Sequence, residues 1–248
     1  MKFKAIIILF SILYVVPSYA LNLSEIRTEI RRNIRDSDSA NYRYSDATMN
    51  SLINQGQKEV VNLTWCTFKS TSYALTALTT YYTLPQDFLA ARLVYFRNTQ
   101  GNTINLSQLG EQSLYDKNPS WDKTSIGSPV SYYVSNATNP VVSSSSSLRI
   151  SYIPIAPATS TGTVTVWYFN EVSDLISDSD IPFEGRRNLF SYHMAIVYYV
   201  TMRLMAIDGI NDDVALYQGL YTSQIGIMKQ RVFYSPNYNP SFGAGDGR

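Results

Sequence analysis

The strongest constraint on the fold is a long β-rich stretch that is enclosed on both sides by helical sequence. Residues 81–89 (Tyr-Tyr-Thr-Leu-Pro-Gln-Asp-Phe-Leu) lead into the strand-like run 92–96, and the stretch closes at residues 162–169. Short runs of β-branched and aromatic residues, separated by turn formers, are typical of strands. The pattern therefore predicts an α+β fold in which a β-rich block is inserted into a helical frame. Further strand candidates are residues 73–78, 81–84, 103–106, 130–134 and 148–153.

Two helices are expected before this block. Apolar residues recur every three or four positions from Leu23 to Ile34, which is the spacing of one helical face, and Ser24 is the expected N-cap. Ser45 is expected to cap the second helix. One side of that helix is formed by Met49, Leu52, Ile53, Gly56, Val60 and Leu63.

Two further helices are expected after the block. Helical spacing continues from Arg186 to Ile207, Gly209 ends that helix, and Asn211 or Asp212 caps the next. Because each helix pair needs a partner for its apolar face, the two pairs should pack together and leave the β block protruding to one side. The residues expected to be buried between them are Leu52, Ile53, Val60, Ile196, Val197, Val200 and Leu204.

These patterns divide the chain into five segments. The four-helix frame consists of two N-terminal and two C-terminal helices, and an extended tail follows it. The segments are a signal-like hydrophobic segment (1–20), the N-terminal helices (21–66), the β-rich insertion (67–172), the C-terminal helical pair (173–232) and a flexible C-terminal arm (233–248).

The first segment has the layout of a secretory signal peptide. Lys2 and Lys4 precede an apolar run, and Ser18 and Ala20 supply small residues before a cleavage point. The apolar run is too short for a comfortable membrane span. Cleavage would make Leu21 the first residue of the mature chain. The alternatives are an uncleaved anchor and a hydrophobic arm that is buried in an assembly.

A basic stripe runs along the first helix. Arg27, Arg31 and Arg35 recur at every fourth position, and Arg32 lies beside them. Such a stripe is either a solvated helix face or a surface that docks on an acidic partner. If it docks, reversing all three charges to Glu should abolish assembly and leave the subunit folded.

The sequence predicts no catalytic, metal-binding or cofactor-binding site. Cys66 and His193 are each the single residue of their kind, which excludes an internal disulfide and a His/Cys metal cluster. His193 falls in an apolar helix with no nucleophile that the sequence assigns to it, so we interpret it as structural. The formal net charge of +1 gives no global field that would attract nucleic acid. We therefore expect a protein that is not an enzyme.

The C-terminal segment has no periodicity that could build a core. Tyr234, Tyr238 and Phe242 are its apolar anchors, and Pro236 and Pro240 separate them. Prolines keep a chain extended, and so short a segment has too little apolar surface to order by itself. We expect an arm that is mobile in the free subunit and binds a partner in an assembly.

The order of these segments resembles the head–tail adaptor, or connector, proteins of tailed bacteriophages, especially those of short-tailed phages. The resemblance covers roughly residues 22–235, and each motif in it is a structural turn, so their order carries the weight. The matching pieces are the capped helix from Arg43 through Val61, the turn 82–88 (Tyr-Thr-Leu-Pro-Gln-Asp-Phe), residues 127–133 (Gly-Ser-Pro-Val-Ser-Tyr-Tyr), residues 148–154 (Leu-Arg-Ile-Ser-Tyr-Ile-Pro) and the run from Leu175 to Pro182.

The resemblance implies a structural virion protein at the head–tail interface. Its copies would form a ring, commonly of twelve, below the portal, and the ring would line part of the DNA exit channel. The implied partners are the portal protein, neighbouring adaptor subunits and the next tail component, with transient contact to exiting DNA. The residues that would bind the portal or a neighbouring subunit are Arg27, Arg31, Arg35, Tyr234, Tyr238 and Phe242. The signal-like N-terminus departs from this pattern, because phage virions assemble in the cytoplasm.

A second interpretation belongs to another class of protein. If residues 1–20 are a cleaved signal peptide, the chain is an exported periplasmic or cell-surface binding module whose β block binds a ligand through tyrosines. The chain contains 20 tyrosines, which suit either protein contacts or a Tyr-rich sheet.

Overall fold

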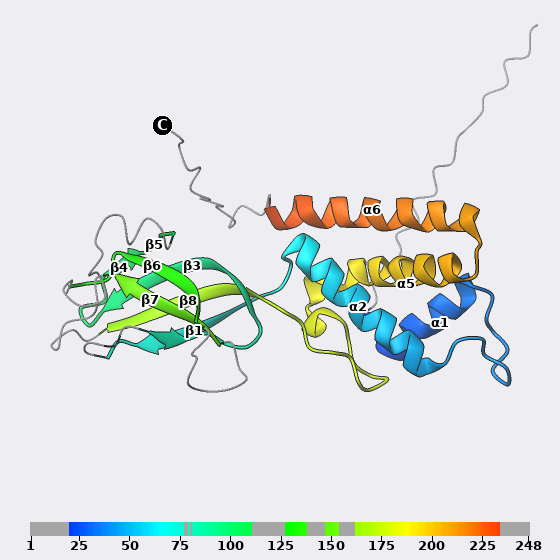
Figure 1. Cartoon of the computed structure of the whole chain (residues 1–248), viewed down its shortest axis with the longest axis horizontal. Helices are drawn as coiled ribbons and strands as arrows, with labels where there is room; N and C mark the ends of the chain where they lie inside the picture. Colours follow the sequence, from blue (N-terminus) through cyan, green and yellow to red (C-terminus); the bar gives the residue numbers. More distant parts are fainter. Residues whose placement is uncertain are drawn as a thin grey trace, which may run out of the picture.

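The structure, a computed structural model, describes residues 20–76, 79, 81–110, 127–137, 147–153 and 162–233. The described residues contain two N-terminal helices, two sheets and two C-terminal helices, so the predicted α+β class is confirmed (Figure 1). Residues 1–19 and 234–248 lie outside the described part of the chain, together with the predictions made for them. The helices are α1 (Leu23–Asn33), α2 (Asp46–Thr64), α5 (His193–Ile207) and α6 (Asn211–Phe233), and two 3₁₀ turns, η1 (Phe183–Gly185) and η2 (Arg187–Tyr192), precede α5.

The helices form one bundle around α5. α5 packs against α1, α2 and α6, and its residues Ile196, Val197, Val200 and Leu204 are fully buried. This explains why its apolar residues extend around most of its circumference, as expected for a helix inside a bundle. Of the residues predicted to be buried, all are except Leu52, which is partly buried at the edge of the same core.

The β block is a sandwich of two sheets. The first sheet has the strand order β1-β8-β3-β4, and all its neighbours are antiparallel. The second has the order β2-β7-β6-β5, in which β5 and β6 run parallel. Side chains such as Phe96, Ile150 and Val166 fill the space between the sheets. The strands are β1 (Phe68–Ala74), β2 (Tyr82–Thr83), β3 (Phe88–Asn98), β4 (Thr103–Asn105), β5 (Ser107–Gln108), β6 (Ser131–Ala137), β7 (Ser147–Ile153) and β8 (Gly162–Asn170).

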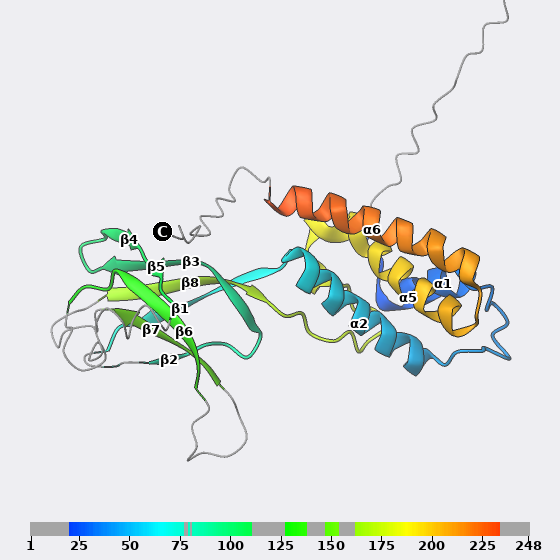
Figure 2. The same ribbon diagram turned by 45° about the horizontal axis from the view of Figure 1, so that its top comes forward.

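The β block lies beside the helical bundle and not between its helix pairs, as predicted (Figures 1 and 2). Two chain segments connect them: the turn from α2 into β1 and the segment from β8 to η1. Trp65 ends α2 in the left-handed conformation (φ 54°), and its ring packs edge-on against Phe169 of β8 at 4.8 Å. This contact helps to fix the point at which the chain leaves the bundle.

Several predicted boundaries were wrong. The N-cap of α1 is Asn22, whose side chain accepts a hydrogen bond from the Glu25 N–H, and Glu25 returns a bond to the Asn22 N–H. Ser24 therefore lies inside the helix, because Asn22 completes a capping box that Ser24 cannot. The third helix begins at His193 and not near Arg186, since residues 187–192 form a 3₁₀ turn. The predicted cap at Ser45 is confirmed.

Gly56 marks the closest approach of α2 to α5. A Cβ atom added there would lie 2.8 Å from Cδ1 of Tyr199. We expect Gly56→Leu to lower the free energy of unfolding by about 1–3 kcal/mol, because overpacking forces neighbours out of position. The exposed Ser51→Leu on the same helix should change it by less than about 0.5 kcal/mol. Chemical denaturation measures both, and equal values for the two variants would contradict this packing.

Candidate functional site

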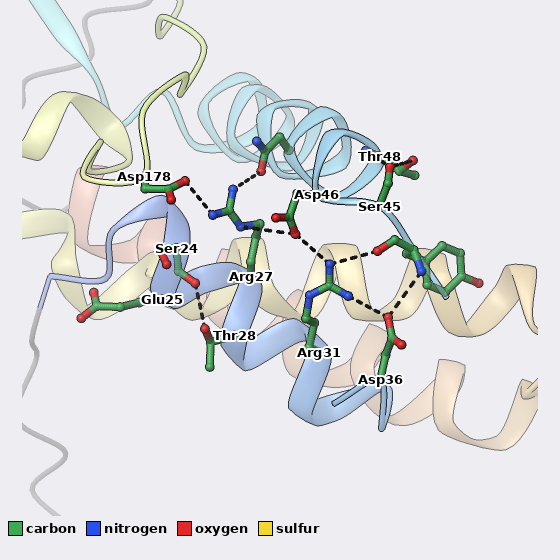
Figure 3. Close-up of polar contacts among 12 residues, drawn as sticks. Ser24, Glu25, Arg27, Thr28, Arg31, Asp36, Ser45, Asp46, Thr48 and Asp178 are labelled. Atoms are coloured by element: carbon green, nitrogen blue, oxygen red, sulfur yellow. Dashed lines mark hydrogen bonds and ion pairs between the residues drawn. The ribbon is translucent and has the colours of Figure 1, made fainter. Parts of the chain in front are cut away.

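Arg31 of α1 is a buried ionic centre at the end of the bundle (Figure 3). Its Nη1 donates to Oδ2 of Asp36 at 2.8 Å, and its Nη2 donates to Oδ1 of Asp46 at 2.7 Å and to the carbonyl oxygen of Tyr44 at 2.9 Å. The Tyr42 ring covers the guanidinium group at 3.4 Å. Arg31 is only 6% exposed, so its partners replace most of the water that the charge would otherwise have.

Arg27 lies one turn earlier and continues the same network. Its Nη2 pairs with Oδ1 of Asp178 at 2.6 Å, and its Nη1 donates to Oδ1 of Asn50 at 3.0 Å. Its Nε lies 3.8 Å from the Asp46 carboxylate, which thereby bridges Arg27 and Arg31. Asp46 is the first residue of α2, where a negative charge also interacts favourably with the helix dipole. The network joins α1, α2 and the segment from β8 to η1.

The solvated-face interpretation of the basic stripe was therefore wrong for Arg27 and Arg31. A spacing of four residues places the arginines on one face of the helix. It does not reveal that this face meets carboxylates from other parts of the chain. Arg35 does lie exposed, just beyond α1, at a positive φ of 55°. Partner binding by Arg27, Arg31 and Arg35 stays a prediction, and Arg35 is the one of the three whose side chain is accessible.

Asp36 and Asp208 fix the loop between α1 and α2. Asp36 is buried, and its Oδ1 accepts a hydrogen bond from the Arg43 N–H at 2.9 Å. Asp208, after α5, accepts from the Tyr44 hydroxyl at 2.6 Å and pairs with Arg43 at 2.5 Å. Burial, followed by this bond to Asp208, raises the pKa of Tyr44 to about 12. The loop is thus attached to both α1 and α5.

The segment between β8 and η1, residues 171–182, is held against α2 by side-chain amides. Asn54 exchanges two hydrogen bonds with the backbone of Leu175, at 2.8 and 3.2 Å. Gln57 is fully buried and bonds the carbonyl oxygen of Ser173 and the N–H of Phe183, both at 2.9 Å. Periodicity places Gln57 on the helix but does not reveal that its amide satisfies a distant backbone. The sequence therefore did not predict that Asn54 and Gln57 bind a distant backbone.

A second polar network fixes the β block to the bundle. Lys69 of β1 pairs with Asp87 at 2.9 Å and with Glu184 of η1 at 2.7 Å. Glu184 also accepts a hydrogen bond from Asn170 of β8 at 3.1 Å. Arg186 donates to the carbonyl oxygen of Phe68. These contacts come from four places in the chain, so no local sequence pattern announces them.

His193 is enclosed at the start of α5. Its Nδ1 accepts a hydrogen bond from the Leu21 N–H at 3.0 Å, and it lies between the rings of Phe183 and Phe190. Its Nε2 has no hydrogen-bond partner among the described residues. Burial lowers the pKa of His193 to about 4, so the ring is neutral at pH 7. The ring therefore holds the start of α1 against α5.

The described residues contain no group of three or more His, Cys, Asp or Glu side chains that could hold a metal ion. Cys66 is buried, and burial raises the pKa of its thiol to about 11, which suppresses the reactive thiolate. Among the helices of the described residues, none has the length and apolar character that crossing a membrane requires. Tyr234, Tyr238 and Phe242 lie outside the described residues.

Residues 21–240 match the family described as SU10 adaptor protein. The chain therefore belongs to the SU10 adaptor family, and the resemblance to phage adaptors is confirmed. A comparison with curated proteins returns no match.

Family membership gives the chain a general role. It is a bacteriophage adaptor, a structural component of the virion that associates with other head or tail proteins. A structural family fits the expectation that the chain is not an enzyme.

Removing the charge of Arg31 should destabilise the subunit strongly. We expect Arg31→Ala to lower the free energy of unfolding by about 3–5 kcal/mol, because it leaves Asp36 buried without its partner. Arg32→Ala removes an exposed arginine that pairs with Glu29, so it should cost less than about 1 kcal/mol. Urea denaturation compares the two variants.

The Arg27/Arg31/Arg35 triple reversal to Glu is expected to unfold the subunit, so it cannot test docking.

His193 should make the stability depend on pH. Its pKa is about 4 in the folded subunit against 6.5 for an ordinary histidine. As the pH falls, the unfolded chain therefore binds the proton before the folded subunit does. The stability that neutral His193 contributes is fully present above pH 6.5 and is lost as the pH falls through 4. The loss amounts to roughly 3 kcal/mol.

His193→Gln keeps a hydrogen-bond acceptor that does not titrate. Unfolding measured from pH 7 to pH 4 should be less pH-dependent for this variant than for the wild type. Identical pH profiles would contradict a buried neutral His193.

Proposed function

We propose that this protein is the head-to-tail adaptor of a short-tailed phage, whose copies form a ring below the portal and line the DNA exit channel. The observation that carries the proposal is the family match over residues 21–240, which includes both the helical bundle and the β block. Its partners are the portal protein, neighbouring subunits and the next tail component, and exiting DNA makes transient contact with the ring.

The two polar networks support this role physically. A ring that holds pressurised DNA needs subunits whose parts do not shift against each other. Arg31 and Asp46 join α1 to α2, and Lys69 and Glu184 join the β block to the bundle. Charged contacts of this kind join elements from different parts of the chain and favour one arrangement over others, although they add little net stability. Each subunit can then present its surfaces in a fixed relation.

The five segments of the chain take separate roles in this proposal. The helical segments, 21–66 and 173–232, form the body of the subunit, and the β-rich insertion, 67–172, forms its projecting lobe. The arm, 233–248, extends to the portal or to a neighbouring subunit, and Tyr234, Tyr238 and Phe242 are its anchors. For segment 1–20 the three alternatives are a cleaved signal peptide, an uncleaved anchor and a hydrophobic arm buried in the assembly. The alternative function, an exported periplasmic or surface binding module, rests on residues 1–20 alone, and these lie outside the family match.

Phage particles assembled without this protein test the proposal. We expect heads that package DNA but lose it, because the exit channel below the portal lacks its adaptor. Restoring the full chain in trans should restore DNA retention, and antibody labelling should find the protein at the tail vertex of each particle. Particles that keep their DNA and attach tails without the protein would contradict an adaptor role.

The arm is tested by deleting residues 235–248. We expect the melting temperature to stay nearly unchanged, because the segment offers little apolar surface to the fold, while stable attachment to particles is lost. Tyr238→Ser with Phe242→Ser should repeat this loss, whereas the matched pair Asn237→Ser with Asn239→Ser should attach normally. Truncated protein that assembles into particles retaining DNA would reduce the arm to a terminus without a function.

A further inference from the structure

The outer face of α6 has an unusual composition for an exposed helix. α6 packs on α5 through one side, while Leu216, Leu220 and Ile227 on the other side are 58%, 38% and 42% exposed. No charged residue occurs from Val214 to Met228. The outward face of a surface helix is normally polar and charged, and a charge-free apolar face is typical of a protein interface.

Two glycines on this face are a second indication that it is a protein interface. Gly219 and Gly226 are seven positions apart, which places them on one side of the helix two turns from each other. A Cβ atom added to either would meet nothing within 4 Å. The described part of the subunit thus does not need them for its own packing, although glycine weakens a helix. Glycine does allow another chain to approach the helix backbone closely.

A rigid apolar projection is found on segment 171–182. Ile176 is 83% exposed, yet its N–H and that of Ser177 both donate to Oδ2 of Asp180 at 2.8 Å. These two bonds lower the pKa of the Asp180 carboxyl. The adjacent Leu175 is buried and bonded to Asn54. The loop therefore presents an isoleucine on a hydrogen-bonded backbone, and burial of this side chain against a partner surface would be favourable.

These two surfaces lie on opposite sides of the subunit. α6 forms one side of the helical bundle, and segment 171–182, coloured yellow-green, lies beyond α2 on the other (Figures 1 and 2). A closed ring needs head-to-tail contacts in which two different surfaces of successive copies meet. With twelve copies each subunit turns by only about 30° relative to the last, so the two surfaces must be nearly opposite.

We propose that the Ile176 loop of one subunit docks on the outer face of α6 of the next copy, beside Gly226. The inference rests on the ring of the proposed function and assigns its subunit interface. Charges agree with this pairing: Asp174 and Asp178 flank the isoleucine, and Lys229 lies about one helical turn beyond Gly226. Lys58 and Arg27 pair with the two aspartates, whose side chains nevertheless stay 53% and 71% exposed. Opposite charges at the rim orient such a contact.

Cysteine crosslinking tests the interface in assembled particles. Ile176→Cys and Gly226→Cys combined in one full-length chain should give a ladder of covalent oligomers under mild oxidation, because a disulfide requires neighbouring Cβ atoms. A mixture of the two single variants should give dimers, and either single variant alone should give none. The native Cys66 is buried, so it does not compete. Asn102→Cys, in the β block, replaces Ile176→Cys in the control pair and should not crosslink to position 226.

A second pair of variants tests the close approach at α6. Gly226→Leu should leave the subunit folded, since its side chain points into open space, and should reduce ring assembly at least tenfold. Gln218→Leu, exposed on another side of α6, should assemble normally. Rings that form without the 176–226 crosslink, or that tolerate Gly226→Leu, would overturn this interface and leave the adaptor function standing. A wild-type chain that forms no ring would overturn both.

Discussion

The pairing of Arg27 and Arg31 with Asp46 is the interaction on which the arrangement of the bundle depends. The two arginines come from α1, the carboxylate begins α2, and Asp178 extends the network into segment 171–182 (Figure 3). Apolar packing against α5 brings these elements together without specifying their register, because hydrophobic contact is non-directional. The hydrogen bonds that the Arg31 guanidinium group makes to Asp36 and Asp46 are directional, so they select one register.

The same directional logic applies at the junction with the β block. Trp65 turns the chain out of α2, and Lys69 then meets Asp87 and Glu184 from three different parts of the chain. The sandwich has its own core between its two sheets, and the bundle has its core around α5. A polar junction between two separate cores keeps one geometry only if several contacts form at the same time. In an adaptor this fixed relation allows each lobe to face a different neighbour.

The sequence predicted the helices and most of the strands because their patterns are local. The first strand was placed wrongly, since β1 begins at Phe68 and not at Tyr73, and β5 was not predicted. Periodicity located the apolar faces of α2 and α5, and turn formers separated the strands of the sandwich. Ser24 was a wrong cap because Asn22 and Glu25 form a reciprocal pair that outweighs a serine two residues later. Arg27 and Arg31 were taken for a surface stripe because Asp36, Asp46 and Asp178 are not adjacent to them in sequence. The docking of Asn54 and Gln57 on a segment more than a hundred residues away could not be read from the sequence either.

The central claim is that copies of this chain close into a ring on the portal. Native mass spectrometry of the full-length protein mixed with the purified portal measures this most directly. The account predicts one dominant complex in which the portal carries twelve copies of the chain. A portal that carries none, or single copies bound without a fixed number, would contradict it.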